Sequence, residues 1–309
     1  MERGTLHEWV TGIDIGGSHI TVGMVNMQTR SVVEGSILRG RVDCHADADT
    51  ILSSWCKVIR DVWQKFAITP APLGFAMPGP FDYTNGICLI KGFDKYESLY
   101  EMDIREALAE RLGINGDEIC FRNDAEAFLE GEMFCGSAEG YTDAIVVTLG
   151  TGLGTATSHH GISADAELSV IPYKGEKIEE FVSTRGLVRA YESITCKKLK
   201  DGKAVADLYD TDENARSAFK TFSNDLRWFL EYFIRKEEPQ VLVIGGNIIQ
   251  SWDLFMPEIL DYLSAALPNL PKIVKATLGE SAALIGGACC FNALFTEHVA
   301  IQSNIAQKS

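Results

Sequence analysis

The sequence predicts an α/β protein with two related lobes, and three observations support this prediction. Segments of strand character alternate with segments of helical spacing, which is typical of α/β folds. A strand that ends in glycines occurs near residue 14 and again near residue 149, so the same pattern appears in both halves. A chain of 309 residues is long enough for two lobes that pack around a cleft.

The first half contains short apolar runs bounded by glycine or proline, which predict strands, and apolar residues at helical spacing, which predict helices. Its strands are expected at residues 10–15, 20–25, 32–38, 73–77 and 118–122, and its helices at residues 50–66, 104–112 and 125–133. The strand at 73–77 ends at Pro78-Gly79-Pro80, because proline interrupts regular structure.

The second half repeats the same order of elements. Its strands are expected at residues 144–149, 241–244 and 272–276, and its helices at residues 184–195, 217–235 and from Gly279 through Cys290. The apolar stripe of the helix at 217–235 is rich in phenylalanine and leucine, which indicates a buried face. The boundary between the lobes is expected near Arg122, where the first set of elements ends.

The composition disfavours several classes of protein. A net charge of −15 would repel a phosphate-rich polymer, so we expect no nucleic-acid partner. No apolar run is long enough to cross a membrane and the first residues do not form a secretory signal, so we expect a cytoplasmic protein with no membrane partner. The eight cysteines form no CxxC or CxC pair, which favours reduced thiols over disulfides or a zinc site.

Two glycine-rich turns after strands are candidate phosphate sites, because backbone N–H groups of glycine can approach an anion closely. Their residues are Asp14, Gly16, Gly17 and Ser18 in the first turn, and Gly150, Thr151, Gly152 and Gly154 in the second. Asp14 could hold Mg²⁺ through water. Either turn alone could be an ordinary tight turn, but together they indicate one triphosphate held from two sides. No P-loop or GxGxxG pattern is present, which disfavours those nucleotide sites.

Asn123 and Asp124 follow a predicted strand and begin a predicted helix. A carboxylate there could accept the proton of a substrate hydroxyl during phosphoryl transfer. Asn and Asp are also the residues that most often cap the start of a helix. On the residues alone, both interpretations remain open.

Taken together and in order, these motifs resemble those of the ROK family of sugar kinases, within the actin/hexokinase-like ATPase fold. The matching segments are Asp14-Ile15-Gly16-Gly17-Ser18, Pro78-Gly79-Pro80, Asn123-Asp124-Ala125, residues 150–154, Gly245-Gly246-Asn247-Ile248, and Leu278-Gly279-Glu280 with Ile285-Gly286-Gly287-Ala288. The resemblance implies a duplicated ribonuclease H-like fold with a central cleft. The small lobe would comprise residues 1–121 joined by a C-terminal helix at 292–309, and the large lobe residues 122–291.

The resemblance also implies a function and a set of site residues. The chain would transfer the γ-phosphoryl group of ATP to a sugar hydroxyl, with Mg²⁺ as the metal, and Asp124 would be the general base. The sugar would contact Asn123, Asp124, Glu167, Glu179, Pro78 and Gly79. The nucleotide would be bound by both glycine turns and by Gly245, Gly246 and Asn247.

The sequence departs from the family pattern at two points. Val170 stands where the family's GEIGH segment has its His, and the CxCGxxGCxE zinc segment is missing, so no zinc is expected. The missing His removes one hydrogen bond to the sugar, which puts the identity of the sugar in doubt more than the reaction.

Glucose is the favoured acceptor, because it is the common acceptor of zinc-free relatives that have two Glu contacts. The alternatives are another hexose, an N-acylhexosamine such as N-acetylmannosamine or N-acetylglucosamine, and a non-catalytic sugar-sensing regulator of the same fold. A DNA-binding repressor is disfavoured, because only 13 residues precede Asp14. The family resemblance is also compatible with a homodimer.

Overall fold

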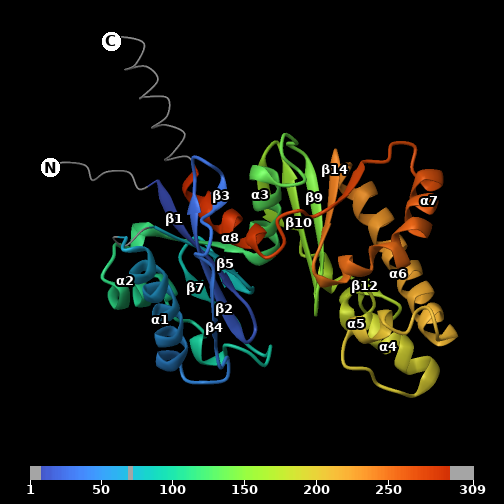
Figure 1. Ribbon diagram of the computed structural model, residues 1–309, viewed down its shortest axis with the longest axis horizontal. Coiled ribbons are helices and arrows are strands. Elements are labelled where there is room, and N and C mark those ends of the chain that lie inside the picture. Colours follow the sequence, from blue (N-terminus) through green and yellow to red (C-terminus); the bar gives the residue numbers. More distant parts are fainter. Residues whose placement is uncertain (1–7, 69–71, 293–309) are drawn as a thin grey trace, which may run out of the picture. The chain divides into compact units, whose positions relative to one another are not determined.

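The structure is a computed structural model that describes residues 8–68 and 72–292 (Figure 1). The chain forms two compact units. The described part of unit 1 lies within Met1–Glu139 and Glu280–Ser309, and unit 2 is Gly140–Gly279. Each unit contains one main β-sheet and helices that pack on it.

The sheet of unit 1 has the strand order β3-β2-β1-β5-β8, with β4 beside β2. β1 and β2 form an antiparallel hairpin, whereas β1, β5 and β8 run parallel. The strands of the unit are β1 (Trp9–Ile15), β2 (His19–Asn26), β3 (Ser31–Val32), β4 (Leu38–Arg41), β5 (Leu73–Met77), β6 (Phe81–Asp82), β7 (Ile87–Cys88) and β8 (Ile119–Asn123). Its helices are α1 (Ala48–Phe66), α2 (Ile104–Leu112), α3 (Asp124–Cys135) and α8 (Ser281–Ala288), with 3₁₀ turns at Glu97–Leu99, Gly116–Glu118 and Cys289–Phe291.

The two faces of β1 serve different purposes. Ile13 and Ile15 belong to the apolar cluster that also contains Trp55 of α1. Gly12 lies on the opposite face, where a Cβ atom would be 2.2 Å from the backbone oxygen of Leu284 in α8. Because side chains alternate along a strand, Asp14 lies on the same face as Gly12. The end of β1 therefore presents a carboxylate on the side of the sheet that α8 covers.

Helices α3 and α8 pack against each other at backbone distance. A Cβ atom on Gly286 of α8 would lie 1.6 Å from the backbone oxygen of Ala127, and one on Gly131 of α3 would lie 2.1 Å from that of Ala282. No side chain fits between the helices at these two positions. The small residues of α8 are thus required by packing, and they hold the start of α3 at its place next to the sheet.

We expect Gly286→Ala to destabilise the protein by about 3 kcal/mol or more, because the added methyl group must push two helix backbones apart. Urea unfolding followed by circular dichroism measures this change. Gly116→Ala is the matched control, since its Cβ atom would meet the Arg105 side chain at 3.6 Å, an ordinary contact. A Gly286→Ala protein as stable as the control would contradict the close packing of α3 on α8.

The sheet of unit 2 has the strand order β11-β10-β9-β14-β15, in which β9, β14 and β15 run parallel. The strands are β9 (Ala144–Leu149), β10 (Leu153–His159), β11 (Ile162–Asp165), β14 (Val241–Gly245) and β15 (Lys272–Lys275), and β12 (Pro172–Tyr173) with β13 (Glu176–Lys177) form a separate hairpin. The helices are α4 (Thr184–Thr195), α5 (Gly202–Ala206), α6 (Glu213–Glu237) and α7 (Met256–Ala266), with 3₁₀ segments at Leu168–Val170, Ile178–Glu180 and Asn247–Leu254.

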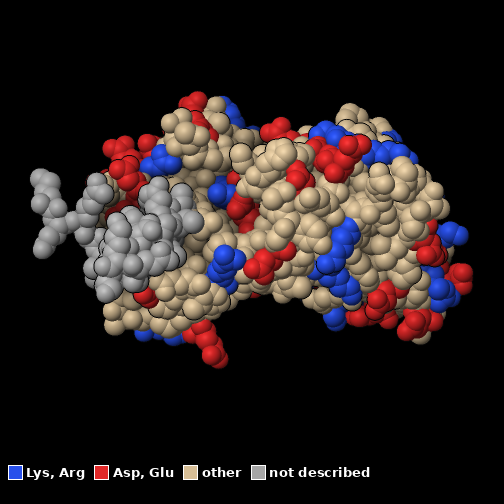
Figure 2. Space-filling model, turned by 90° about the horizontal axis from the view of Figure 1, so that it is seen from above, with Lys and Arg blue, Asp and Glu red and all other residues tan. Residues whose placement is uncertain are grey.

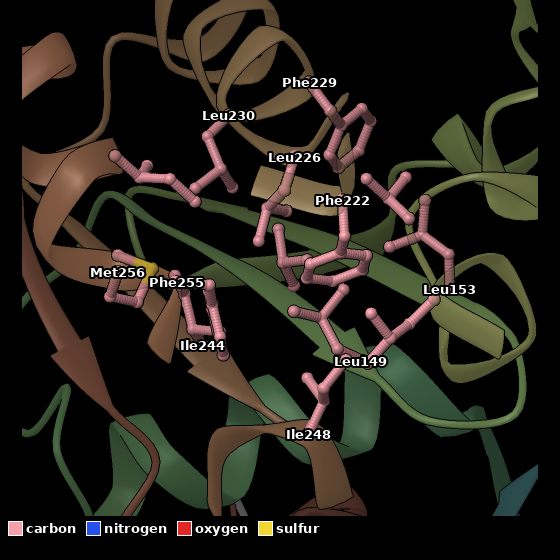
Figure 3. Close-up of a cluster of buried hydrophobic side chains, with 14 of the residues drawn as sticks. Leu149, Leu153, Phe222, Leu226, Phe229, Leu230, Ile244, Ile248, Phe255 and Met256 are labelled. Atoms are coloured by element: carbon pink, nitrogen blue, oxygen red, sulfur yellow. The ribbon is translucent and has the colours of Figure 1, made fainter. Parts of the chain in front are cut away.

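The core of unit 2 lies between α6 and its sheet (Figure 3). Phe222 and Leu226 of α6 pack with Leu149 at the end of β9 and Ile244 near the end of β14, and all four are fully buried. This packing follows the stripe of aromatic and aliphatic residues that the sequence predicts for this helix. It fixes the strand ends from which the second glycine turn and Gly246 emerge.

Two predicted features differ from the structure. The strand expected at residues 32–38 is instead a turn between β3 and β4, because Gly35 adopts φ +72° and the Ser36 amide donates to the Val33 carbonyl. The units also divide at residues 139/140 and 279/280 rather than after residues 121 and 291, because α3 packs on α8 within unit 1. The predicted C-terminal helix at 292–309 lies outside the described residues apart from Asn292.

Two further features of the described residues concern the helices and the cysteines. No helix in the described part of the chain has the length and apolar character needed to span a membrane. All eight cysteines are free, and they range from buried Cys56 to exposed Cys196.

Candidate functional site

The first glycine turn, residues 16–18, connects β1 to β2. The Gly16 amide donates to the His19 carbonyl at 2.9 Å, which closes the turn. A Cβ atom on Gly16 would lie 2.5 Å from the His19 ring, so the position of that ring leaves room only for glycine. Gly17 and Ser18 are exposed, and no atom lies within 4 Å of a Cβ on Gly17. The turn therefore presents open backbone directly after Asp14, as a phosphate site requires.

Tyr96 fixes the first glycine turn through a hydrogen bond to its backbone. Its hydroxyl donates to the Gly16 carbonyl at 2.6 Å, and its ring is fully buried against Trp55 with the ring centres 5.7 Å apart. The Tyr96 amide in turn donates to the Cys44 carbonyl at 2.8 Å. Burial raises the pKa of Tyr96, so the hydroxyl stays protonated and remains a donor. Sequence patterns did not point to this residue.

If the chain uses the phosphoryl donor that the family resemblance implies, Tyr96→Phe should raise the KM for that donor several-fold, with little change in kcat. The substitution leaves the Gly16 carbonyl without its donor, which costs about 1 kcal/mol and loosens the turn. Steady-state kinetics with varied ATP measure the effect, and thermal unfolding reports whether the fold is intact. An unchanged donor KM would show that the turn does not depend on this hydrogen bond.

Asn123 and Asp124 lie where β8 ends and α3 begins. The Asn123 side chain caps α3, since its oxygen accepts from the amides of Ala125 at 2.9 Å and Glu126 at 3.2 Å. Its Nδ2 donates to the hydroxyl of Tyr83 at 3.2 Å, and that hydroxyl donates to the Met77 carbonyl. The cap interpretation therefore holds for Asn123, and Tyr83 is a residue of this site that the sequence analysis missed.

Asp124 is not the capping residue, and its side chain is exposed. One of its oxygens accepts from the Ala125 amide at 2.9 Å. The Asp124 side chain contacts solvent, but desolvation by the surrounding protein raises its pKa. The Ala125 N–H and the positive charge of Lys95 oppose this rise. An accessible carboxylate of raised pKa is well suited to accept a proton from a hydroxyl group.

Asp14 and Asp124 lie close enough to influence each other electrostatically. Burial raises the pKa of Asp14 to about 7, the charges of Asp124 and Glu280 add to the rise, and Arg39 opposes it. Unit 1 thus gathers three carboxylates next to the first glycine turn. Two of them, Asp14 and Asp124, were predicted as site residues, whereas Glu280 and Arg39 reach the site only through the fold.

Such a concentration of negative charge is suited to a hard cation. Mg²⁺ prefers carboxylate oxygens and retains several waters, so a single nearby carboxylate can hold it through water. Asp14 fits that role by its position and by the like charges around it. Within the described residues no group of three or more His, Cys, Asp or Glu side chains is arranged as a direct metal cage.

Pro78 and Gly79 follow β5, next to the end of β8. Met77 and Asn123 are paired in the parallel register of these strands, so the turn after Met77 begins beside Asn123. The Gly79–Pro80 peptide bond is cis. A Cβ atom on Gly79 would lie 3.1 Å from the Tyr83 hydroxyl. The predicted acceptor residues Pro78, Gly79 and Asn123 are therefore neighbours within unit 1, with Tyr83 among them.

The second glycine turn lies in unit 2, between β9 and β10. The Gly150 amide donates to the Gly152 carbonyl at 3.0 Å, and Gly154 lies within β10 opposite Thr148. Gly245 pairs with Thr148 in the neighbouring strand, so β9 and β14 end at the same edge. Gly246 has φ +85° and a Cβ atom there would be 2.4 Å from the Leu149 oxygen, which leaves no room for another residue.

A pocket of about 670 Å³ lies beside this edge of the sheet. It is lined by Thr151 of the second glycine turn and by Asn247, both of which were predicted to bind ATP. The other lining residues include Thr184, Asp201, Lys203, Asp207, Gln250 and Asp253. They come from α4, from α5 and its two capping residues, and from the 3₁₀ segment Asn247–Leu254, and no sequence pattern indicated them.

The structure places the two predicted sugar-binding glutamates differently. Glu179 lies against the second glycine turn: its Oε2 accepts from the Leu153 amide at 3.3 Å, and a Cβ atom on Gly152 would lie 2.6 Å from that oxygen. Arg185 pairs with the other oxygen at 3.4 Å. Glu167 is exposed in a left-handed conformation with φ +52°, and Val170 nearby is 54% exposed. Glu179 therefore contacts the second glycine turn, whereas the Glu167 amide donates to the Asp165 side chain at 2.8 Å.

The sequence matches one family model and several curated proteins. The sequence model of the ROK family matches residues 10–165 and 158–293. A glucokinase of Thermotoga maritima is 25% identical, with 90% of this chain and 95% of that protein aligned. An N-acetyl-D-glucosamine kinase of Photobacterium profundum is 24% identical over 90% of this chain and 97% of its own length.

A solved structure shares the fold. The ROK family glucokinase of Streptomyces griseus, in complex with glucose and AMPPNP, matches with a TM-score of 0.74 at 20% identity, covering 91% of this chain and 98% of that one. The predicted two-lobed actin-like ATPase fold is therefore confirmed.

Proposed function

The chain belongs to the ROK family, and from this premise we propose that it is a hexose kinase that transfers the γ-phosphoryl group of ATP to a hydroxyl of glucose. The predicted class of enzyme, an ATP-dependent phosphotransferase with a sugar hydroxyl as acceptor, agrees with the family and its curated relatives. The observation that carries the proposal is the position of Asp124, an accessible carboxylate of raised pKa beside Asp14 and the first glycine turn.

In this proposal Asp124 accepts the proton of the attacking sugar hydroxyl. Asn123, held by α3 and by Tyr83, still has one N–H on its amide nitrogen with which to orient the sugar. Pro78 and Gly79 shape the same region of unit 1. Mg²⁺ near Asp14 would neutralise part of the charge on the donor phosphates. The backbone N–H groups of the first glycine turn would stabilise the phosphoryl group as charge develops on it.

Unit 2 would bind the nucleotide. Its pocket is large enough for a nucleoside, and Thr151 and Asn247 offer a hydroxyl and an amide at its wall. A Cβ atom on Gly150 would meet nothing within 4 Å, so the backbone beside Thr151 is open, and Gly245 and Gly246 lead from the end of β14 to Asn247. The pocket also contains Lys203, the one basic residue among its lining side chains in the described part of unit 2. We propose that ATP is recognised here.

The relatives support two kinds of sugar acceptor. Glucose is supported by the T. maritima relative and by the S. griseus structure, whereas the P. profundum relative supports an N-acylhexosamine. Val170, which stands in place of the family His, is exposed and offers no hydrogen bond to a sugar hydroxyl. A pocket that lacks this donor should discriminate less sharply among hexoses.

A coupled assay of ADP release tests the proposal directly. Purified protein with ATP and Mg²⁺ is given glucose, mannose, fructose, N-acetylmannosamine or N-acetylglucosamine in turn. We expect the highest kcat/KM with glucose. ADP release that no sugar stimulates would refute the kinase and favour the alternative of a non-catalytic regulator of the same fold, which calorimetric sugar binding would then detect.

The charge distribution is consistent with a small-molecule substrate. On the face in Figure 2, Lys and Arg side chains lie in small groups beside Asp and Glu. We propose that the chain acts on a sugar and a nucleotide, in the cytoplasm and without a nucleic-acid or membrane partner, and that a homodimer is the assembly to test by light scattering.

A further inference from the structure

A second hollow lies in unit 1, directly beside the first glycine turn. It has a volume of about 370 Å³ and is lined by Ser18, His19, Arg39, Gly40 and Arg41. Ser18 belongs to the turn itself, and its carbonyl accepts from the Val42 amide at 3.0 Å. The hollow is thus a continuation of the proposed phosphate site along β2 and β4, and no predicted site residue other than Ser18 lines it.

The register of β2 and β4 places three basic side chains on one face of the sheet. Arg41 is paired with His19, and Arg39 with Thr21. Residues two apart on a strand share a face, as do residues paired across strands, so Arg39, Arg41 and His19 all project to the same side. Gly40, between the arginines, faces the other way, where a Cβ atom would be 2.4 Å from Val58 of α1.

Arg39 is held in place by two acceptors. Its Nη2 lies 2.8 Å from Nε2 of His19, and its Nη1 lies 3.3 Å from Oε1 of Glu280. Because a guanidinium group only donates, His19 must accept through Nε2 and carry its proton on Nδ1. The guanidinium has five N–H groups, so further donors remain for a ligand.

The Arg41 side chain makes no hydrogen bond or ion pair with any of the residues that the structure describes, and it is exposed. An arginine that lines a hollow next to an oriented arginine can add a second fork of donors for the same anion. The two residues flank Gly40 and face the end of the turn at Ser18.

The charge balance makes these arginines unusual for their location. The chain carries a net charge of −15, and Asp14, Asp124 and Glu280 add negative charge next to the turn. A phosphate group would be repelled there unless cations stood close by. Arg39 lies near enough to oppose the effect of the carboxylates on Asp14. Arg39 and Arg41 therefore supply the positive charge that an anion at this turn needs.

We propose that His19, Arg39 and Arg41 form a phosphate-binding subsite that extends the first glycine turn. The inference rests on the proposed function, because it assigns this subsite to the phosphoryl donor. The ligand chemistry is a phosphate group of a linear phosphate chain, and it has two sources: the terminal phosphates of ATP, or an inorganic polyphosphate used as donor. In the second case the terminal phosphoryl group passes to the sugar oxygen, Asp124 takes the hydroxyl proton, and a chain shorter by one phosphate leaves.

Arginines on an edge strand have a simpler explanation, since charge there discourages pairing with other strands. β4 pairs with β2 alone among the described strands, so it is such an edge. That role needs only charge and no ligand. The two explanations differ in what happens to anion binding when one arginine is neutralised.

Calorimetric titration with tripolyphosphate, without nucleotide or sugar, tests the subsite. We expect the wild type to bind tripolyphosphate, and Arg39→Gln and Arg41→Gln each to weaken binding about tenfold or more. Arg30→Gln is the matched control, because Arg30 is also an exposed arginine of unit 1 with a glutamate partner, Glu139. The same proteins are titrated with ATP, and they are assayed for glucose phosphorylation with ATP or tripolyphosphate as the donor.

The outcomes distinguish the two sources of the phosphate group, and they separate a failure of the subsite from a failure of the proposed kinase activity. A parallel loss of ATP affinity assigns the subsite to the nucleotide, whereas normal ATP affinity with tripolyphosphate-driven glucose phosphorylation assigns it to polyphosphate. Unchanged binding of both anions in Arg39→Gln and Arg41→Gln, or an equal loss in Arg30→Gln, overturns the subsite. A wild type that binds tripolyphosphate but phosphorylates no sugar keeps the subsite and refutes the kinase.

Discussion

Asp124→Ala should lower kcat for sugar phosphorylation by roughly 10²–10⁴-fold, because it removes the proposed acceptor of the hydroxyl proton. ATP binding, measured by calorimetry, should be unchanged, since the proposed nucleotide pocket is lined by residues of unit 2. The fold should also persist, because Asn123 and not Asp124 caps α3 through the amides of Ala125 and Glu126. Loss of turnover with normal binding and stability is the expected signature of a general base.

Asp103→Ala is the matched control for this experiment. Asp103 caps α2 in the same unit, with its side chain accepting from the Glu106 amide at 2.8 Å. Its loss should cost about 1 kcal/mol of stability and leave turnover intact. Asp124→Ala and Asp103→Ala therefore have opposite expected effects on activity and stability. If Asp124→Ala lowers stability and spares kcat, Asp124 serves the helix and the assignment fails.

The sequence predicted best those parts of the fold that local patterns determine. The glycine turns follow β1 and β9 as expected, and α2 and α4 begin and end at the predicted residues. Asn123 shows both the strength and the limit of such patterns. Its residue type indicated a helix cap, and its position indicated a substrate contact. The structure confirms the cap, and the substrate contact through its remaining N–H stays a proposal. A local motif can thus satisfy two interpretations at once.

The rest of the fold and of the candidate site depends on contacts between residues far apart in the chain. Tyr96 reaches Gly16 across 80 residues, and Arg39 reaches Glu280 across 241. Neither pair has a sequence signature, because a tyrosine or an arginine in a loop or short strand has many other uses. The unit boundary was misplaced for the same reason: α3 follows the first set of elements in sequence, but Gly131 and Gly286 show that it packs on a helix from the far end of the chain.

Asp14→Asn should raise the stability of the protein at pH 8 and lower its activity. The pKa of Asp14 rises from 3.8 to about 7 on folding. Between these values the folded protein binds more protons than the unfolded chain, so stability falls as the pH rises and the cost is complete above pH 7. Asparagine does not titrate, so Asp14→Asn should be more stable than the wild type at pH 8, by at most about 4 kcal/mol. Below pH 4 the difference should vanish, because both forms are then neutral.

Urea unfolding of the ligand-free protein in chelator at pH 4, 6 and 8 measures this difference, and Asp61→Asn, which neutralises an exposed partner of Lys57, provides the control. In the kinase assay the same Asp14→Asn protein should lose about 10–100-fold in kcat/KM, as expected when a group that holds the metal through its water shell is removed. A residue that lowers stability and raises activity is retained for its chemistry. Should Asp14→Asn prove no more stable at pH 8 than at pH 4 relative to the wild type, burial and the neighbouring carboxylates do not raise the pKa of Asp14, and the electrostatic basis for a cation there is lost.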